Sequence, residues 1–319
     1  MPEMTLREKI IATAKQFEAD IVCFGGAERF KNTRVMEIFP ETKTVICLAF
    51  RVARGVYRGI EEGTTYYQYC TNGVEVIEEV IMPRAMLRVS AVLEDAGYLG
   101  LPQRRHQCIM EADEGHNFEM HYEEIYHGCK TEPQMDFEES AVLCGLGEKS
   151  MNGRILTEEF GPMQRWCFVL TDAELEETPL AETQLCDKCG ACVKACPGKA
   201  IAEDGAINAW QCGPYYRGAR LAKNPFMPPD AFADFENREA IMAGEAQLTP
   251  EESIKVMANC YFYPPIKQGY AASVCGRACD MACYIHLEEQ GKLKKAFQTP
   301  FRKRPEWFLE PDTSYPYNK

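Results

Sequence analysis

Four cysteines near residue 190 have the spacing that holds an iron–sulfur cluster. Two residues separate Cys186, Cys189 and Cys192 from one another, and Cys196 follows three residues later, directly before Pro197. Bacterial ferredoxins use this run, in which closely spaced thiolates wrap a loop around one [4Fe–4S] cubane. A structural zinc site would instead take its ligands from two separated pairs. The run therefore predicts iron–sulfur chemistry and one-electron transfer.

The run implies further ligands elsewhere in the chain, because its fourth cysteine normally serves a second cluster. Three later cysteines, at positions 275, 279 and 283, are separated by three residues each. We expect the first cluster to take Cys186, Cys189, Cys192 and Cys283. We expect the second cluster to take Cys196, Cys212, Cys275 and Cys279. Cys260 is a rival to Cys212, because the later spacing and Tyr284 after Cys283 differ from a plain two-cluster ferredoxin.

The other cysteines are expected to have a different use. The chain has 16 cysteines and its N-terminus shows no export signal, so we predict a cytoplasmic protein without disulfides. Most of the eight remaining cysteines should be small, buried apolar side chains. They are Cys23, Cys47, Cys70, Cys108, Cys129, Cys144, Cys167 and Cys260.

Charge and hydropathy restrict the expected partners. A net charge of −13 weighs against nucleic acid, because such binding relies on Lys and Arg displacing counterions from phosphates. The chain has no apolar run near the roughly 18–20 residues that span a bilayer, so no membrane partner is expected. With 319 residues, 46% of them hydrophobic, it can form one large domain or two modest ones.

Helical and strand patterns alternate ahead of the cysteine run. Short apolar runs predict strands over residues 21–24, 44–50 and 165–170. Apolar residues at helical spacing predict helices over residues 5–17 and 74–96, the second interrupted at Pro83, and a capping box predicts a helix from Thr249. These elements indicate an α+β (α/β-like) fold. We divide the chain into a domain at 1–180, a ferredoxin-like domain at 181–290 with an insertion at about 220–258, and a tail at 291–319.

Several motifs upstream of the cysteine run resemble those of one enzyme superfamily. They are Cys144-Gly145-Leu146-Gly147-Glu148, then Asn152-Gly153-Arg154-Ile155-Leu156-Thr157-Glu158-Glu159-Phe160-Gly161-Pro162, then Val169-Leu170-Thr171-Asp172. Their order and their distance from the cysteines are similar to those of the reductive dehalogenase and epoxyqueuosine reductase superfamily. The resemblance extends over about residues 10–290, and Trp210-Gln211-Cys212 resembles the stretch that supplies a ligand of the second cluster there.

This resemblance implies a fold, a cofactor and a reaction. The implied fold is a nitroreductase-like α+β domain followed by a ferredoxin-like domain with two [4Fe–4S] clusters. The implied cofactor is a cobalamin bound base-off, and its candidate binding residues are Gly145, Leu146, Gly147 and Gly161. Electrons would pass from a low-potential donor, such as ferredoxin or flavodoxin, through the clusters to the cobalamin, which reduces a small organic substrate.

The resemblance also implies a proton donor. In dehalogenase-like members a tyrosine, helped by a basic residue and an asparagine, protonates the nascent carbanion. The candidates for these catalytic roles are Tyr126, Arg165 and Asn152, with Tyr122 and Lys130 in reserve. A nearby cation lowers the pKa of a tyrosine and so assists proton transfer. The alternative is that Tyr126 and Arg165 only pack and cap a strand.

Two departures separate the chain from the epoxyqueuosine reductases. Those enzymes carry a Val-Asp pair upstream of the glycine turn, and the corresponding place near Thr131 has no such pair. The C-terminal helical repeats of the longer tRNA-acting members are missing as well. We therefore predict an oxidoreductase of the reductive dehalogenase type. The alternatives are an electron-transfer protein without a corrinoid and an epoxyqueuosine reductase-like enzyme.

Overall fold

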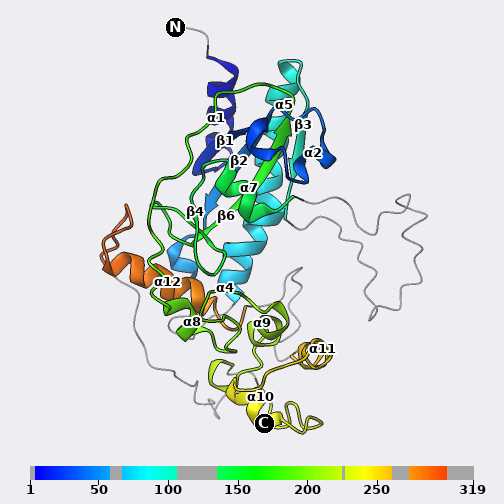
Figure 1. Cartoon of the computed structure of the whole chain (residues 1–319), viewed down its shortest axis with the longest axis vertical. Coiled ribbons are helices and arrows are strands. Elements are labelled where there is room, and N and C mark those ends of the chain that lie inside the picture. Colours follow the sequence, from blue (N-terminus) through cyan, green and yellow to red (C-terminus); the bar gives the residue numbers. More distant parts are fainter. Residues whose placement is uncertain (1–3, 58–66, 106–134, 225–226, 261–272, 300–319) are drawn as a thin grey trace, which may run out of the picture. The chain divides into compact units, whose positions relative to one another are not determined.

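The computed structural model describes residues 4–57, 67–105, 135–224, 227–260 and 273–299 (Figure 1). Within it the chain forms two compact units. The first unit comprises Met1–Phe50, Glu78–Glu148 and Arg165–Thr183. The second unit comprises Arg51–Ile77, Lys149–Gln164 and Gln184–Lys319. The chain passes from the first unit to the second for the last time after Thr183, close to the domain boundary predicted at residue 180. Residues 51–77 and 149–164 lie in the predicted first domain but group with the second unit.

A four-stranded sheet forms the centre of the first unit (Figure 1). Its strands, in spatial order, are β1 (Ile21–Gly26), β2 (Thr44–Arg51), β6 (Gln164–Thr171) and β3 (Gly100–Gln103). β1 runs antiparallel to β2, and β3 runs antiparallel to β6. β2 and β6 are buried along almost their whole length, which explains why their sequences are continuous apolar runs rather than alternating ones. All three predicted strands are confirmed.

Helices α1 (Leu6–Gln16) and α5 (Met82–Asp95) pack against each other beside this sheet. A capping box starts α1: the Thr5 hydroxyl accepts from the Glu8 N–H, and the Glu8 carboxylate accepts from the Thr5 N–H at 2.8 Å. The predicted interruption at Pro83 is confirmed, because α5 begins there and the preceding chain winds as π-helical turns, η3 (Thr71–Glu75) and η4 (Ile77–Ile81). The shorter helices are η1 (Ala27–Phe30), α2 (Val35–Ile38) and α7 (Phe137–Leu143).

Short helices make up most of the second unit. In chain order they are η2 (Arg54–Tyr57), α4 (Tyr67–Cys70), α8 (Ala191–Ala195), α9 (Ala209–Tyr216), η5 (Leu221–Lys223), α10 (Arg238–Ala243), α11 (Pro250–Ala258) and α12 (Ala278–Glu289). A small two-stranded sheet pairs β4 (Glu148–Lys149) with β5 (Ile155–Leu156). α12 packs against α8, and α11 packs against α9. The helix predicted from Thr249 is confirmed as α11, with the predicted capping box.

Two separate apolar clusters hold these helices together. The larger one joins α9 to α10 and α11, which belong to the predicted insertion, through residues that include Tyr215, Phe232, Ile241 and Val256. The smaller one consists of Leu156, Leu185 and Leu287, with Cys186 and Cys283 packed against it. The small cluster therefore packs against the cysteine loop through Cys186, and α12 contributes Leu287 to it.

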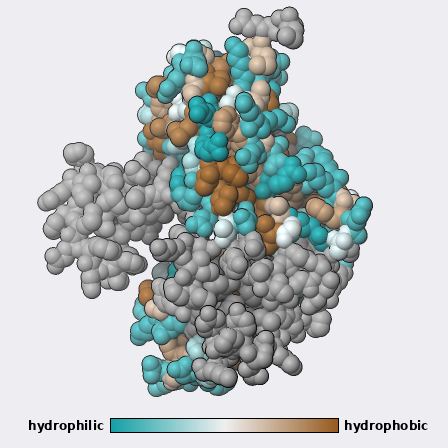
Figure 2. All heavy atoms as spheres, turned by 180° about the vertical axis from the view of Figure 1, so that it is seen from behind, coloured by the Kyte–Doolittle hydropathy of each residue, from teal (hydrophilic) through white to brown (hydrophobic). Residues whose placement is uncertain are grey.

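Figure 2 shows one face of the molecule. Hydrophilic residues cover most of the described part of the face in Figure 2, interrupted by apolar patches. None of the helices within the described ranges combines the length and the apolar character needed to cross a membrane.

The mixture of an antiparallel sheet with packed helices confirms the predicted α+β fold class.

Candidate iron–sulfur sites

Four cysteines of the second unit line one cavity. We call them the first cysteine group: Cys186, Cys189, Cys192 and Cys283. The first two lie on the loop before α8, the third on α8 and the fourth on α12. Gly190 permits the turn from loop to helix, because it has a φ of 71°, in the left-handed region that favours glycine. The structure thus brings together all four residues predicted to hold the first cluster.

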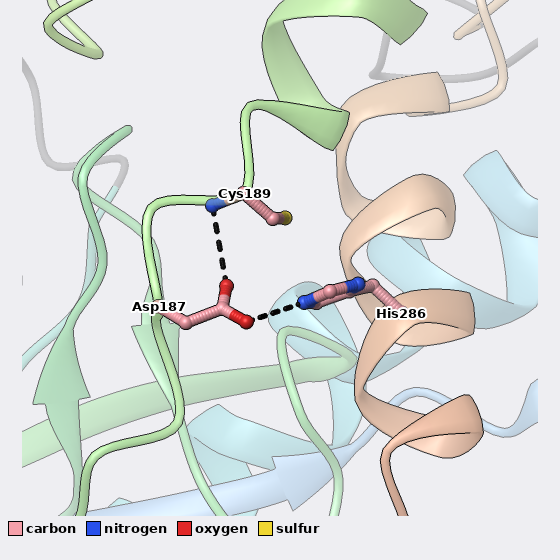
Figure 3. Close-up of side chains that lie close together, drawn as sticks. All are labelled: Asp187, Cys189 and His286. Atoms are coloured by element: carbon pink, nitrogen blue, oxygen red, sulfur yellow. Dashed lines mark hydrogen bonds and ion pairs between the residues drawn. The ribbon is translucent and has the colours of Figure 1, made fainter.

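A carboxylate ties the cysteine loop to α12 (Figure 3). The Asp187 Oδ1 atom accepts from the Cys189 N–H at 3.2 Å, and its Oδ2 atom pairs with His286 Nε2 at 2.8 Å. Gln290 Nε2 donates to the same Oδ2 atom at 2.9 Å. The hydrogen bonds from His286 and Gln290 hold the pKa of Asp187 well below its usual range. Because α12 also carries Cys283, this clamp fixes the fourth cysteine relative to the other three.

The same three side chains offer a carboxylate, a thiol and an imidazole within 4.8 Å of one another. Such a set resembles a transition-metal site. However, Cys189 belongs to the first cysteine group, and both carboxylate oxygens of Asp187 already accept hydrogen bonds. We therefore assign Asp187 and His286 to the clamp. Lys292 reinforces it, because its Nζ donates to the carbonyl oxygens of Gln184 and Leu185 at 2.9 and 3.1 Å.

The loop between β4 and β5 forms another wall of this cavity. Ser150, Met151 and Asn152 all line it, and the Met151 N–H donates to Cys186 Sγ at 3.4 Å. Hydrogen bonds to sulfur favour the thiolate, the form in which cysteine binds metal. The sequence motifs do not predict this wall, because the resemblance connects the same segment with the cobalamin and the proton donor.

A second cysteine group consists of the residues predicted for the second cluster: Cys196, Cys212, Cys275 and Cys279. Cys196 ends α8, Cys212 lies on α9, Cys275 precedes α12 and Cys279 is on it. Burial raises the pKa of Cys212, and the neighbouring thiols of Cys275 and Cys196 raise it further. Burial also raises the pKa of Cys279, with the Asp280 carboxylate and Cys275 contributing. These effects join Cys212 with Cys275 and Cys196, and Cys279 with Cys275.

The rival ligand Cys260 lies in different surroundings. It is buried in the larger apolar cluster, and its Sγ donates to the carbonyl oxygen of Pro214 at 3.8 Å. Burial raises its pKa to about 12. This placement favours Cys212 as the fourth residue of the second group, and the ligand assignment itself stays a prediction.

Buried ionic side chains surround the second group. The Asp280 carboxylate, whose side chain is 4% exposed, pairs with Arg277 Nη2 at 2.7 Å and with Arg154 Nε at 3.2 Å. Both guanidinium groups act to lower the pKa of Cys212 and Cys279, against the effect of burial. Two cations and one anion leave a net positive charge, which favours thiolates and a negatively charged cluster. Sequence motifs did not reveal this network, because its members come from separate segments.

The three catalytic candidates fall in different parts of the chain. Tyr126, like its reserves Tyr122 and Lys130, lies outside the described residues. Arg165 is on β6 in the first unit, where its Nη1 pairs with Glu78 Oε1 at 3.2 Å and the Glu78 side chain is 7% exposed. Asn152 belongs to the second unit and lines the cavity of the first cysteine group. Their joint catalytic role stays a prediction.

Two of the glycines predicted to bind the cofactor are needed for the local structure of the chain. Gly145 has a φ of 81°, and a Cβ atom on it would lie 2.3 Å from the carbonyl oxygen of Pro179. Gly161 has a φ of 55° and packs against Tyr284 and Leu287. Leu146 and Gly147, between the two, are buried. The chain's own packing therefore explains the requirement for glycine at positions 145 and 161, and their role toward a cofactor stays a prediction.

Comparison with known proteins identifies related enzymes. Residues 182–202 match the family model described as a 4Fe-4S binding domain. A tetrachloroethene reductive dehalogenase from Dehalobacter restrictus is 39% identical over 89 residues, covering 27% of this chain and 15% of the relative. An epoxyqueuosine reductase from Lactococcus garvieae is 34% identical over 83 residues, covering 25% of this chain and 22% of the relative. The chain thus matches less than a quarter of either curated relative.

Solved structures of both enzyme types resemble the chain at low identity. The structure of epoxyqueuosine reductase from Streptococcus thermophilus has a TM-score of 0.45 and 13% identity, covering 81% of this chain and 80% of that one. A catabolic reductive dehalogenase has a TM-score of 0.48 and 15% identity, covering 79% of this chain and 35% of that one. The curated relatives confirm the predicted resemblance, since they include both reductive dehalogenases and an epoxyqueuosine reductase.

Proposed function

Because the chain is homologous to reductive dehalogenases and epoxyqueuosine reductases, we propose that it is an iron–sulfur reductase that acts on a small organic molecule. Two [4Fe–4S] clusters carry the electrons, one in each cysteine group. The observation that carries this proposal is the convergence of Cys186, Cys189, Cys192 and Cys283 on one cavity from two separate segments. The donor set is four thiols, which suits an iron–sulfur cubane.

Two helices support a short path between the clusters. α8 carries Cys192 of the first group and ends at Cys196 of the second. α12 carries Cys279 of the second group and, one turn later, Cys283 of the first. The contact between α8 and α12 supports placing both groups close to the same pair of helices. This arrangement suits consecutive one-electron steps, as in a two-cluster ferredoxin.

We further propose that a cobalamin is the electron acceptor. When bound, a base-off corrinoid supplies a low-potential cobalt centre for reducing the substrate. Support for this part comes from the related enzymes, since Gly145 and Gly161 are explained by packing within their own units. Tyr126, helped by Arg165, remains the proposed donor that protonates the nascent carbanion, and Glu78 orients the Arg165 guanidinium through their ion pair.

Metal analysis of the protein purified without oxygen tests the proposal. The protein is incubated with hydroxocobalamin, excess cofactor is removed, and iron, cobalt and the EPR spectrum are recorded together. We expect about eight iron atoms and one cobalt per chain, with a base-off cob(II)alamin signal. Eight iron atoms without retained cobalt would leave an electron carrier. Tight binding of tRNA at physiological salt would favour the epoxyqueuosine reductase alternative.

A further inference from the structure

We infer that Asn152 donates a hydrogen bond from its side-chain amide to a sulfur atom of the cluster in the first cysteine group, and thereby raises the reduction potential of that cluster. The inference rests on the proposed presence of this cluster. It gives Asn152 a role as a positioning and tuning residue, whereas the sequence connected it with proton transfer to the substrate.

The first reason is a buried amide nitrogen without a partner. Asn152 is 4% exposed, and its Nδ2 atom has no hydrogen-bond partner among the described residues. A buried amide donor that lacks an acceptor is costly in free energy, so native structures almost always supply one. Asn152 lines the cavity of the first cysteine group, where a bound cluster would supply sulfur acceptors.

The second reason is the orientation of the amide. The Ser150 hydroxyl oxygen accepts from the Arg154 N–H at 3.0 Å, and the same hydroxyl donates to Asn152 Oδ1 at 2.6 Å. A hydroxyl has one proton, and this arrangement uses it to hold the amide oxygen. The NH₂ group of Asn152 is consequently the end left to donate to another atom.

The third reason is the adjacent backbone. The Met151 N–H, one residue before Asn152, already donates to Cys186 Sγ at 3.4 Å. A tight turn holds both donors at this wall, since the Gly153 N–H donates to the Ser150 carbonyl at 2.9 Å and Gly153 has a φ of 74°. The β4–β5 loop is therefore a set of amide donors facing the first cysteine group.

The expected effect on the cluster follows from charge. Reduction adds one electron to a cluster that is already surrounded by four thiolates. An N–H donor to sulfur offsets part of this negative charge, so it stabilises the reduced state more than the oxidised state and raises the potential. Loss of the donor should shift the one-electron equilibrium about tenfold toward the oxidised cluster, equivalent to about 59 mV.

Redox titration of the holoprotein, followed by EPR, measures this effect. Asn152→Leu removes the donor, and Asn152→Asp removes it and adds a negative charge at nearly the same volume. We expect both variants to lower the potential of one cluster, Asn152→Asp by more, while the other cluster keeps its potential. Asn224→Leu is the matched control, because Asn224 is also buried but its amide donates to the Gly218 carbonyl at 2.8 Å.

A second measurement needs no substitution. In wild-type protein with side-chain ¹⁵N-labelled asparagine, pulsed EPR of the reduced first-group cluster should show a ¹⁵N coupling. Absence of that coupling, or an unchanged potential in both Asn152 variants with full iron content, would overturn the inference. A wild-type protein that lacks the first-group cluster would instead overturn the proposed function, so the two failures are distinguishable.

Discussion

The cysteines of the first unit and those of the first cysteine group differ in the hydrogen bonds that their sulfur atoms make. In the first unit, Cys23, Cys47 and Cys167 on the sheet and Cys144 at the end of α7 are buried. Burial, with the nearby thiols, raises the pKa of Cys47 well above its usual range, and Cys144 Sγ donates to the Val45 carbonyl oxygen at 3.4 Å. In the first cysteine group, Cys186 Sγ accepts a hydrogen bond from an amide and the four thiols line a cavity.

The comparison shows that a high local density of thiols does not make a metal site. Cys23 and Cys47 are directly opposite each other on β1 and β2, yet both are buried, and burial raises the pKa of the Cys47 thiol. A ligand needs to lose its proton, so it needs amide donors or cations near the sulfur and space for the metal. At the first cysteine group the β4–β5 loop supplies an amide donor to Cys186 Sγ, whereas Cys144 Sγ in the first unit is itself the donor, to a backbone carbonyl.

The largest expected effect comes from making the same substitution, cysteine to alanine, in each of the two regions. Cys189→Ala should lower the iron content from about eight to about four atoms per chain, because one of two cubanes loses a ligand. Cys47→Ala should leave the iron content unchanged and cost about 1 kcal/mol of unfolding free energy through lost packing. Iron analysis and chemical denaturation measure both. Loss of iron from Cys47→Ala would show that the cysteines of the sheet also take part in holding a cluster.

The second prediction separates a ligand from a core cysteine within one unit. Cys212→Ala should remove the EPR signal of one cluster, since Cys212 lies among the thiols of the second group. Cys260→Ala should retain both signals and cost about 1–2 kcal/mol of stability, because it leaves a small cavity in the larger apolar cluster. The reverse result, with iron lost from Cys260→Ala alone, would reassign the ligand.

The third and smallest expected effect concerns the clamp between the cysteine loop and α12. Asp187→Ala should speed the loss of iron to a chelator about tenfold, as is typical when a group that orients metal ligands is removed. Asp204→Ala is the matched control, because Asp204 also accepts a backbone N–H at a turn, from Ala206 at 2.9 Å, outside the cavity. Equal rates in both variants would show that Asp187 has no special part in holding the cluster.

Features encoded by neighbouring residues could be predicted from the sequence. The strands formed where apolar runs stood, α1 and α11 began at their capping boxes, and α5 began at Pro83, because each depends on contacts within a few residues. The cysteine run belongs to this class, since its spacing shapes a single loop. Of the three catalytic candidates predicted from the sequence, Tyr126 lies outside the described residues.

Relations between distant segments needed the folded chain. The spacing of the cysteines leaves Cys212 and Cys260 as rivals, but the fold puts the first beside other thiols and the second in an apolar core. Asp187 and His286 are 99 positions apart and meet only because α12 packs beside the cysteine loop. The spacing of residues along the chain therefore encodes the kind of chemistry. Which sulfur atoms accept hydrogen bonds, and which side chains face them, is set by packing between segments whose contacts leave no local signal.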